Sequence, residues 1–269
     1  MFGITPTMEA MLRTLAHFKY LTVSHIAELG ISQSLDKNRK RFLALYERGL
    51  VDRQMHQSVK KKGNKIARTR EKYLWYLTLN GARLLETHTE LELQNIKYSK
   101  KKSEWLQNDY FHRISTISIH IALDKRVEER SGSKAQALLY YHSQKNLNTN
   151  RFEIETRLQV NESQHYTPDM IYSYFDAQNQ PQIYCVEVYK GNRVGYIIQQ
   201  LEKLFWILDN TTKIEQKVGL KAVPRLLIIC DNPTTLQSVK KEIRVHPFFQ
   251  VKGIWEVVLL KLEEDISIY

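Results

Sequence analysis

The 269-residue chain has few of the residues that mark fibrous, disulfide-bonded or membrane-spanning proteins. Ten glycines and six prolines argue against a fibrous or linker-rich chain. The two cysteines, Cys185 and Cys230, stand in apolar runs typical of buried strands, so we expect buried thiols and no zinc site. No apolar run approaches the ~20 residues of a membrane span, and the first residues lack the pattern of a secretory signal. We therefore expect a cytoplasmic protein without membrane insertion.

Positive charge, in contrast, is abundant and concentrated. Forty Lys and Arg against 29 Asp and Glu give a net charge of +11, which favours an acidic partner such as nucleic acid. Residues 31–75 alone hold thirteen basic and four acidic side chains, a net +9. A surface that only needs solubility mixes both signs, so this segment predicts a binding surface. Anionic lipid is a poorer partner, because no basic amphipathic helix with exposed aromatic residues is evident.

The same segment has the pattern of three helices, a hairpin and a final helix. Caps and apolar spacing predict helices over 7–18, 23–30 and 34–48, strands over 51–59 and 71–79, and a last helix after Thr78. Thr7 is the expected cap of the first helix, and Ser32 or Ser34 that of the third. This layout, with the run 77–84, resembles a winged helix-turn-helix domain, which we assign to residues 1–87.

The third helix and the hairpin hold the residues expected to contact double-stranded DNA. On a helical wheel, Leu35, Phe42, Leu45 and Tyr46 face inward, and amide and cationic side chains face outward, as a recognition helix requires. Long, clustered cations in the hairpin suit phosphates. The predicted DNA-binding residues are Gln33, Lys37, Lys40, Arg41, Lys60, Lys61, Lys62, Lys65 and Arg68. A solvated helix face with a basic loop is the alternative.

Beyond a polar, basic connector over 88–108, residues 109–269 predict an α/β domain with a mixed sheet. The expected order is a helix from Asp109, three strands, a helix, a strand, a helix and a strand, which makes a meander followed by a crossover helix. The expected strands are 151–160, 166–176, 181–191, 225–231 and 254–262, and the later helices are 193–208 and 233–244.

Two carboxylates are the candidate for catalytic chemistry. Asp169 and Glu187 stand on successive strands that a hairpin makes neighbours, so their side chains can lie a few Å apart. A hard cation such as Mg²⁺ or Mn²⁺ takes carboxylate oxygens and waters, and Lys190 beside it could position the attacking water. In a protein with a DNA-binding module, the fitting substrate is a phosphodiester.

Pro168-Asp169 and the run from Glu187 to Lys190, on this element order, resemble the PD-(D/E)xK nuclease superfamily. The resemblance implies catalytic Asp169, Glu187 and Lys190, with Asp169 and Glu187 as metal ligands. The family usually separates the acid and the lysine by one residue, and here two intervene. Strand alternation puts Lys190 on the opposite face from Glu187 unless the strand bulges. Gln200 and Lys203 on the next helix are accessory candidates.

The whole chain is similar to replication-relaxation proteins and MOBC-type relaxases of mobile plasmids, which join a winged helix to a nuclease-like domain. The winged-helix pattern, His112-Arg113-Ile114, Pro168-Asp169 and Val186-Glu187-Val188 carry this resemblance. It implies an enzyme that nicks one DNA strand at a plasmid origin of transfer and so initiates conjugative mobilisation. It also implies single-stranded DNA at the nick, and relaxosome or coupling proteins as partners. His112 matches a family position and is a further accessory candidate, although a histidine lining a core helix is the more ordinary reading.

The irregular lysine spacing leaves a second class of function open. In it, the chain is a non-catalytic DNA-binding protein, either a transcriptional regulator or a relaxosome or replication accessory factor, whose nuclease-like domain has decayed. A tyrosine nucleophile also stays open, with Tyr140, Tyr141 and Tyr189 as candidates. The nine histidines lack the close spacing of a metal-binding cluster, and no phosphate-binding glycine loop occurs.

Overall fold

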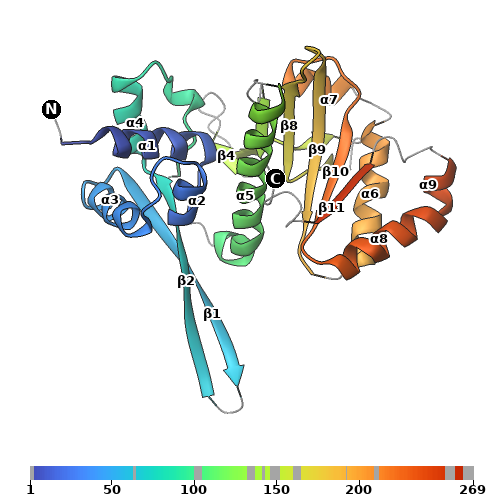
Figure 1. Cartoon of the computed structure of the whole chain (residues 1–269), viewed down its shortest axis with the longest axis horizontal. Helices are drawn as coiled ribbons and strands as arrows, with labels where there is room; N and C mark the ends of the chain where they lie inside the picture. The colour runs from blue at the N-terminus through green and yellow to red at the C-terminus, as the bar shows by residue number, and fades with distance from the viewer. Residues whose placement is uncertain are drawn as a thin grey trace. The chain divides into compact units, whose positions relative to one another are not determined.

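The computed structural model describes residues 3–62, 65–99, 105–131, 137–140, 143–145, 152–159, 165–191, 193–208, 212–251 and 258–262. The chain divides into two compact units (Figure 1). The first comprises residues 1–117 with 144–151, and the second residues 118–143 with 152–269, so the division falls within helix α5 (Trp105–Ser131). Helices and a mixed sheet both occur, which confirms the predicted α/β class. None of the described helices has the length and apolar content to cross a membrane.

The first unit consists of short helices and one long hairpin. Its elements are α1 (Pro6–Phe18), α2 (Val23–Glu28), α3 (Leu35–Glu47), β1 (Val51–Lys62), β2 (Lys65–Leu77), α4 (Leu79–His88) and the 3₁₀ turn η1 (Leu93–Asn95), followed by the start of α5. Strands β1 and β2 pair antiparallel from Val51 opposite Leu77 to Lys62 opposite Lys65, with a bulge between Met55 and Gln57. The hairpin extends well beyond the helices of its unit (Figure 1).

Side-chain caps start the four helices α1–α4. The hydroxyl oxygens of Thr5, Thr22, Ser34 and Thr78 each accept a hydrogen bond from the backbone N–H three residues later, at 3.2–3.4 Å. The prediction that Thr7 caps α1 was wrong. Thr5 takes this role because Pro6, which has no backbone N–H to satisfy and a helical φ, occupies the first helical position.

The buried stripe of α3 is narrower than the helical wheel predicted. Phe42 and Leu45 are buried, and the Phe42 ring stacks on Trp75 of β2 with centroids 4.8 Å apart. Leu35 and Tyr46, also expected inside, are 48% and 39% exposed. The third buried residue of the stripe is polar: the Asn38 side-chain amide donates to the Ser32 carbonyl at 2.7 Å, which ties the helix to its preceding turn.

The run 77–84 contains a glycine, Gly81, that the packing of helix α4 requires. Helix α4 passes so close to the turn before β1 that a Cβ at position 81 would overlap the Leu50 carbonyl oxygen. The Thr78 hydroxyl closes the same junction by donating to the Gly49 carbonyl at 2.6 Å. Only glycine therefore allows this approach of helix and strand.

The second unit is built on a five-stranded sheet in the order β11-β10-β9-β8-β3. The strands are β3 (Ala137–Tyr140), β8 (Met170–Phe175), β9 (Pro181–Tyr189), β10 (Arg225–Cys230) and β11 (Val258–Leu262). β3, β8 and β9 are antiparallel neighbours, whereas β9, β10 and β11 run parallel. Three antiparallel strands followed by parallel crossover strands are present as predicted, but the first of them is β3 and not the strand expected over 151–160.

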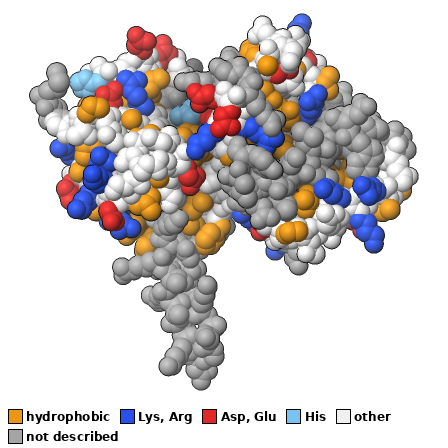
Figure 2. Space-filling model, in the orientation of Figure 1, with side chains coloured by type: hydrophobic (Ala, Val, Ile, Leu, Met, Phe, Trp, Pro, Cys, Tyr) orange, Lys and Arg blue, Asp and Glu red, His pale blue; other side chains and the backbone are white. Residues whose placement is uncertain are grey.

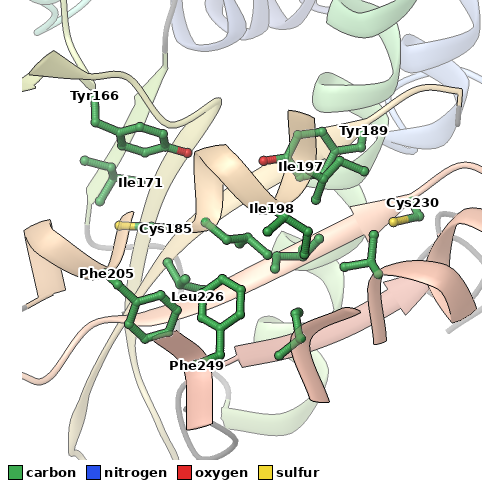
Figure 3. Packing of buried hydrophobic residues seen from close by; sticks show 14 of the residues in the cluster. Tyr166, Ile171, Cys185, Tyr189, Ile197, Ile198, Phe205, Leu226, Cys230 and Phe249 are labelled. Atoms are coloured by element: carbon green, nitrogen blue, oxygen red, sulfur yellow. The ribbon is translucent and has the colours of Figure 1, made fainter. Parts of the chain in front are cut away.

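Helices cover both faces of this sheet. Helices α6 (Val194–Leu208) and α8 (Pro233–Val245) pack on one face, where their apolar side chains meet those of β8, β9 and β10 (Figure 3). On the other face, the Tyr172 hydroxyl of β8 donates to Asp124 of α5 at 2.9 Å, and the ring of His120 lies edge-on to Tyr172. Helices α7 (Thr212–Val218) and α9 (Pro247–Val251) complete the described helices of the unit.

One predicted strand was wrong. Residues 151–160 alternate in polarity, yet they form two short pieces, β5 (Phe152–Ile154) and β6 (Leu158–Gln159), broken by a turn at Glu155 and Thr156. β6 pairs with β7 (His165–Tyr166) outside the main sheet. The edge strand beside β8 is instead β3, and the short β4 (Ser143–Lys145) follows it. The break arises because buried Thr156 turns its hydroxyl to the Pro168 carbonyl, at 2.6 Å.

Candidate functional site

Asp169 and Glu187 come together as the strand order predicted. Met170 pairs with Val186 in the antiparallel ladder of β8 and β9. Extending this register by one residue sets Asp169, just before β8, directly opposite Glu187. Residues opposite each other in such a ladder project to the same face. Both are among the buried polar residues, at 9% and 6% exposure. Two carboxylates therefore share one sheltered position near the start of β8 and the end of β9.

Hydrogen bonds hold Asp169 in place from both sides. Its Oδ2 accepts the backbone N–H of Val188 at 2.8 Å, and the carbonyl of the preceding Pro168 accepts the Thr156 hydroxyl at 2.6 Å. The first bond joins the carboxylate to β9, and the second joins its backbone to the β5–β6 turn. The carboxylate is thus oriented by the fold itself, as a binding or catalytic group requires.

Strand β9 has no bulge near Glu187. Its pairing with β10 runs without a break from Tyr184 to Tyr189, so Tyr189 projects to the same face as Glu187. Lys190 is the first residue after the strand and is exposed. The side chain two residues after the acid, on its own face, is therefore a tyrosine.

The Tyr189 hydroxyl is buried beside the two acids. Burial raises the pKa of this phenol well above its ordinary value, and the nearby carboxylates of Glu187 and Asp169 raise it further. Within the part of the chain that the structure describes, the hydroxyl has no hydrogen-bond partner. Spacing alone pointed to this residue, because position i+2 of a strand shares the face of position i.

Two loops are joined at the edge of the sheet where Glu187 lies. Both carboxylate oxygens of Asp231, after β10, accept the backbone N–H of Gly191 at 3.1 Å. The Gly191 carbonyl accepts the Thr235 hydroxyl at 2.9 Å, and the Tyr189 carbonyl accepts the N–H of Asp231 at 3.1 Å. Gly191 has φ +86°, which favours glycine. The loop after β9 is therefore fixed to the start of α8.

The three accessory candidates lie in different surroundings. His112 belongs to the first unit, on α5, where its side chain is half-buried and its carbonyl accepts the Thr116 hydroxyl at 2.9 Å. Gln200 and Lys203 lie on α6 in the second unit, Gln200 half-buried and Lys203 exposed. Exposure makes Lys203 a poor substitute for a lysine within a buried site.

The predicted DNA-binding residues of α3 are accessible with one exception. Gln33, just before α3, and Lys37 and Lys40 on it are exposed, and Lys and Arg side chains gather over this helix in Figure 2. Arg41 is half-buried, because its guanidinium donates to Ser32 Oγ at 3.0 Å and to Asn38 Oδ1 at 3.2 Å. Lys60, Lys61, Lys62, Lys65 and Arg68 lie on β1 and β2, but their side chains are outside the described residues.

Comparison with known proteins identifies the class. Residues 12–191, two thirds of the chain, match the model of the replication-relaxation family, and the match ends just after Glu187 and Tyr189. The protein belongs to the replication-relaxation family, as the sequence resemblance predicted. The family indicates a role in plasmid replication or mobilisation. No curated protein and no solved structure matches the chain.

Proposed function

We propose that the protein is a divalent-metal-dependent DNA-nicking enzyme that acts as a relaxase at a plasmid origin of transfer. The observation that carries this proposal is the buried position of Asp169 opposite Glu187, near the ends of two inner strands of a mixed sheet. Two carboxylates in one sheltered position suit a shared divalent cation, because like charges repel strongly where water is excluded. Membership of the replication-relaxation family makes DNA the expected substrate.

The first unit supports this substrate as a winged helix-turn-helix domain. Its order of three helices, a two-stranded ribbon and a further helix is that of the fold, with α3 as the recognition helix. Lys37 and Lys40 are exposed on α3, and the hairpin sequence from Val51 to Leu77 adds eight further Lys and Arg residues, five of them among the predicted DNA contacts. Such a surface binds the phosphates of duplex DNA and positions base-reading side chains in the major groove.

The second unit supports a PD-(D/E)xK nuclease-like fold. Helix α5, the antiparallel strands β3, β8 and β9, helix α6 and the parallel strand β10 occur in this order along the chain, with the short strands β4–β7 inserted between β3 and β8. Asp169 lies just before β8 and Glu187 lies on β9, close to the strand positions that the family resemblance implies. After β9, the backbone N–H of Gly191 donates to the Asp231 carboxylate and joins the loops that follow β9 and β10.

The residues at the site fit Mg²⁺ or Mn²⁺. Both are hard cations that take carboxylate oxygens, and Asp169 and Glu187 would hold one between them. When bound, such a cation lowers the pKa of a bound water and offsets the negative charge of a phosphate. Val188 and Thr156 keep Asp169 in one orientation before any ligand binds. Hydrolysis then joins a water oxygen to phosphorus and breaks one ester P–O bond, and the departing sugar oxygen takes up a proton.

The test uses supercoiled DNA that carries the plasmid's origin of transfer. With Mg²⁺ or Mn²⁺, the wild-type protein should convert it to the nicked circle, and Asp169→Ala and Glu187→Ala should each remove this activity. Glu242→Ala, which removes an exposed carboxylate from α8, is the matched control and should nick normally. Equal nicking by the wild type and both site variants would disprove the assignment.

The second candidate function is a non-catalytic DNA-binding protein, a regulator or an accessory factor of the relaxosome. The observation in its favour is that Lys190 lies outside β9 and that Tyr189 occupies the face of Glu187. Titration calorimetry separates the two functions. Mn²⁺ binding that Asp169→Ala abolishes supports the enzyme, and no such binding in the wild type supports the accessory factor.

A further inference from the structure

Two buried tyrosines share the interior of the second unit with the candidate acids. Tyr189 follows Glu187 by two residues on the unbroken strand β9, and Tyr166 on β7 precedes Asp169 by three residues. Both rings belong to the apolar cluster between the sheet and helices α6 and α8, with exposures of 8% and 4%. Their hydroxyls point toward one another in Figure 3.

Neither hydroxyl has a hydrogen-bond partner among the described residues. Removing a hydroxyl from water without a new partner is costly, so buried phenols nearly always find one. Other buried tyrosines of this chain do: Tyr172 donates to Asp124 at 2.9 Å, and Tyr76 donates to Asp52 at 3.0 Å. Two unsatisfied phenols in one cluster, with the carboxylates of Glu187 and Asp169 near Tyr189, point to a ligand that accepts hydrogen bonds.

The chemistry of the four groups defines that ligand. Two carboxylates attract a divalent cation, and a phenol, which stays protonated near neutral pH, donates a hydrogen bond. A phosphodiester offers both requirements at once, since its non-bridging oxygens bind cations and accept hydrogen bonds. Helix α6 packs over this space through Ile197 and Ile198, and the apolar surroundings strengthen each polar contact.

We infer that Tyr189, assisted by Tyr166 of the same cluster, donates a hydrogen bond to a non-bridging oxygen of the scissile phosphate held at Asp169 and Glu187. Tyr189 thereby performs, from the face of Glu187, the charge-offsetting role expected of Lys190 in the sequence. The inference rests on the proposed nicking activity. It makes Tyr189 a catalytic residue, a neutral donor in place of the lysine that the family pattern expects two residues after the acid.

The experiment measures nicking kinetics with Mn²⁺ for Tyr189→Phe, Tyr166→Phe and the control Tyr184→Phe. Tyr184 lies on the same strand but on the other face, stacked on Tyr174 with ring centroids 6.2 Å apart. Tyr189→Phe should lower kcat/KM by about 100- to 1000-fold, the range expected when one donor to a developing charge is lost. Tyr166→Phe should lower it less, and Tyr184→Phe should leave it unchanged.

Two further measurements separate a contact with substrate from a structural role. Because the Tyr189 hydroxyl has no hydrogen-bond partner among the described residues, Tyr189→Phe should keep or raise the thermal unfolding midpoint and should bind Mn²⁺ as the wild type does. Tyr189→Lys, which returns a cationic donor to this face, should nick faster than Tyr189→Phe. The inference would be overturned if Tyr189→Phe had a lower unfolding midpoint and Tyr184→Phe lost the same fraction of its nicking activity.

The remaining outcomes distinguish the two proposals. If the wild type nicks, Asp169→Ala does not, and Tyr189→Phe nicks at the wild-type rate, the inference fails and the nicking proposal stands. A covalent protein–DNA adduct that disappears in Tyr189→Phe would make the phenol oxygen a nucleophile and overturn its role as a donor. If the wild type does not nick with either cation, both proposals fail together.

Discussion

The backbone N–H of Val188 donates a hydrogen bond to Oδ2 of Asp169 at 2.8 Å, across the boundary between β9 and the residue that precedes β8. The backbone of β9 thereby holds the side chain of the residue just before β8 in place. The residue that donates follows Glu187 directly, so the same peptide segment supplies one acid and orients the other. The geometry of the carboxylate pair depends on the register of a single pair of strands.

Thr156 should be needed for both stability and metal binding. Replacing it with valine leaves the buried Pro168 carbonyl without its donor, which should reduce the free energy of unfolding by about 1–3 kcal/mol. The freed backbone before Asp169 should also weaken Mn²⁺ binding. Urea denaturation and calorimetry measure the two effects. Thr87→Val, whose exposed hydroxyl bonds only within α4, is the control and should change neither.

Reversing two charges on α3 should weaken DNA binding in a salt-dependent manner. In Lys37→Glu with Lys40→Glu, two phosphate contacts become repulsive, so the affinity should fall and its dependence on salt should flatten by about two counterions. Fluorescence anisotropy with a duplex at several salt concentrations provides the measurement. Arg83→Glu with Lys221→Glu makes the same charge change at exposed positions elsewhere. An unchanged salt slope in the α3 variant would contradict the recognition-helix assignment.

One substitution at two glycines should have opposite effects. A Cβ added at Gly191 or at Gly195 meets nothing within 4 Å, so only the backbone decides. Gly191 has φ +86°, and alanine there should cost about 1–2 kcal/mol of stability. Gly195 lies within α6, where alanine should stabilise the protein by about 0.4–1 kcal/mol. Chemical denaturation of both variants tests this, and a destabilised Gly195→Ala would contradict it.

The stability of the second unit should fall as the pH rises above 9. Burial raises the pKa of the Cys185 thiol from 9.0 to about 12, so the unfolded chain releases this proton first. Stability from this group is complete below pH 9 and is lost between pH 9 and 12, by about 1.4 kcal/mol between pH 8 and 10. Cys185→Val should lose correspondingly less in urea denaturation under reducing conditions. Ile183→Val, on the same face of β9, should keep the wild-type pH dependence.

The sequence predicted most elements because local signals and tertiary structure agree in them. Thr22, Ser34 and Thr78 cap helices as expected. The hairpin also forms, but its strands reach Lys62 and begin again at Lys65, so they include most of the run 60–70 that was expected to be a basic loop. The facing of Asp169 and Glu187 also followed from strand order. These features depend on residue type and short spacings, which a sequence displays directly.

The rest depends on contacts between distant residues. Alternation over 151–160 suggested one strand, but the bond from Thr156 to Pro168 interrupts it. The apolar side chains of Leu35 and Tyr46 suggested burial, but both are exposed, although the Tyr46 ring lies edge-on to the buried Trp75. The unsatisfied hydroxyls of Tyr166 and Tyr189 could not be inferred from composition, because fifteen tyrosines carry the same group and only packing distinguishes them.

The hairpin of β1 and β2 sets how the first unit would cover a duplex. From the buried Gln54 to Lys62 the strand rises by about 26 Å at roughly 3.3 Å per residue, about twice the width of the major groove. This arm leaves the helices in one direction only. A single bound molecule should therefore leave a lopsided footprint, with protection that reaches farther upstream or downstream of the recognition helix but not both.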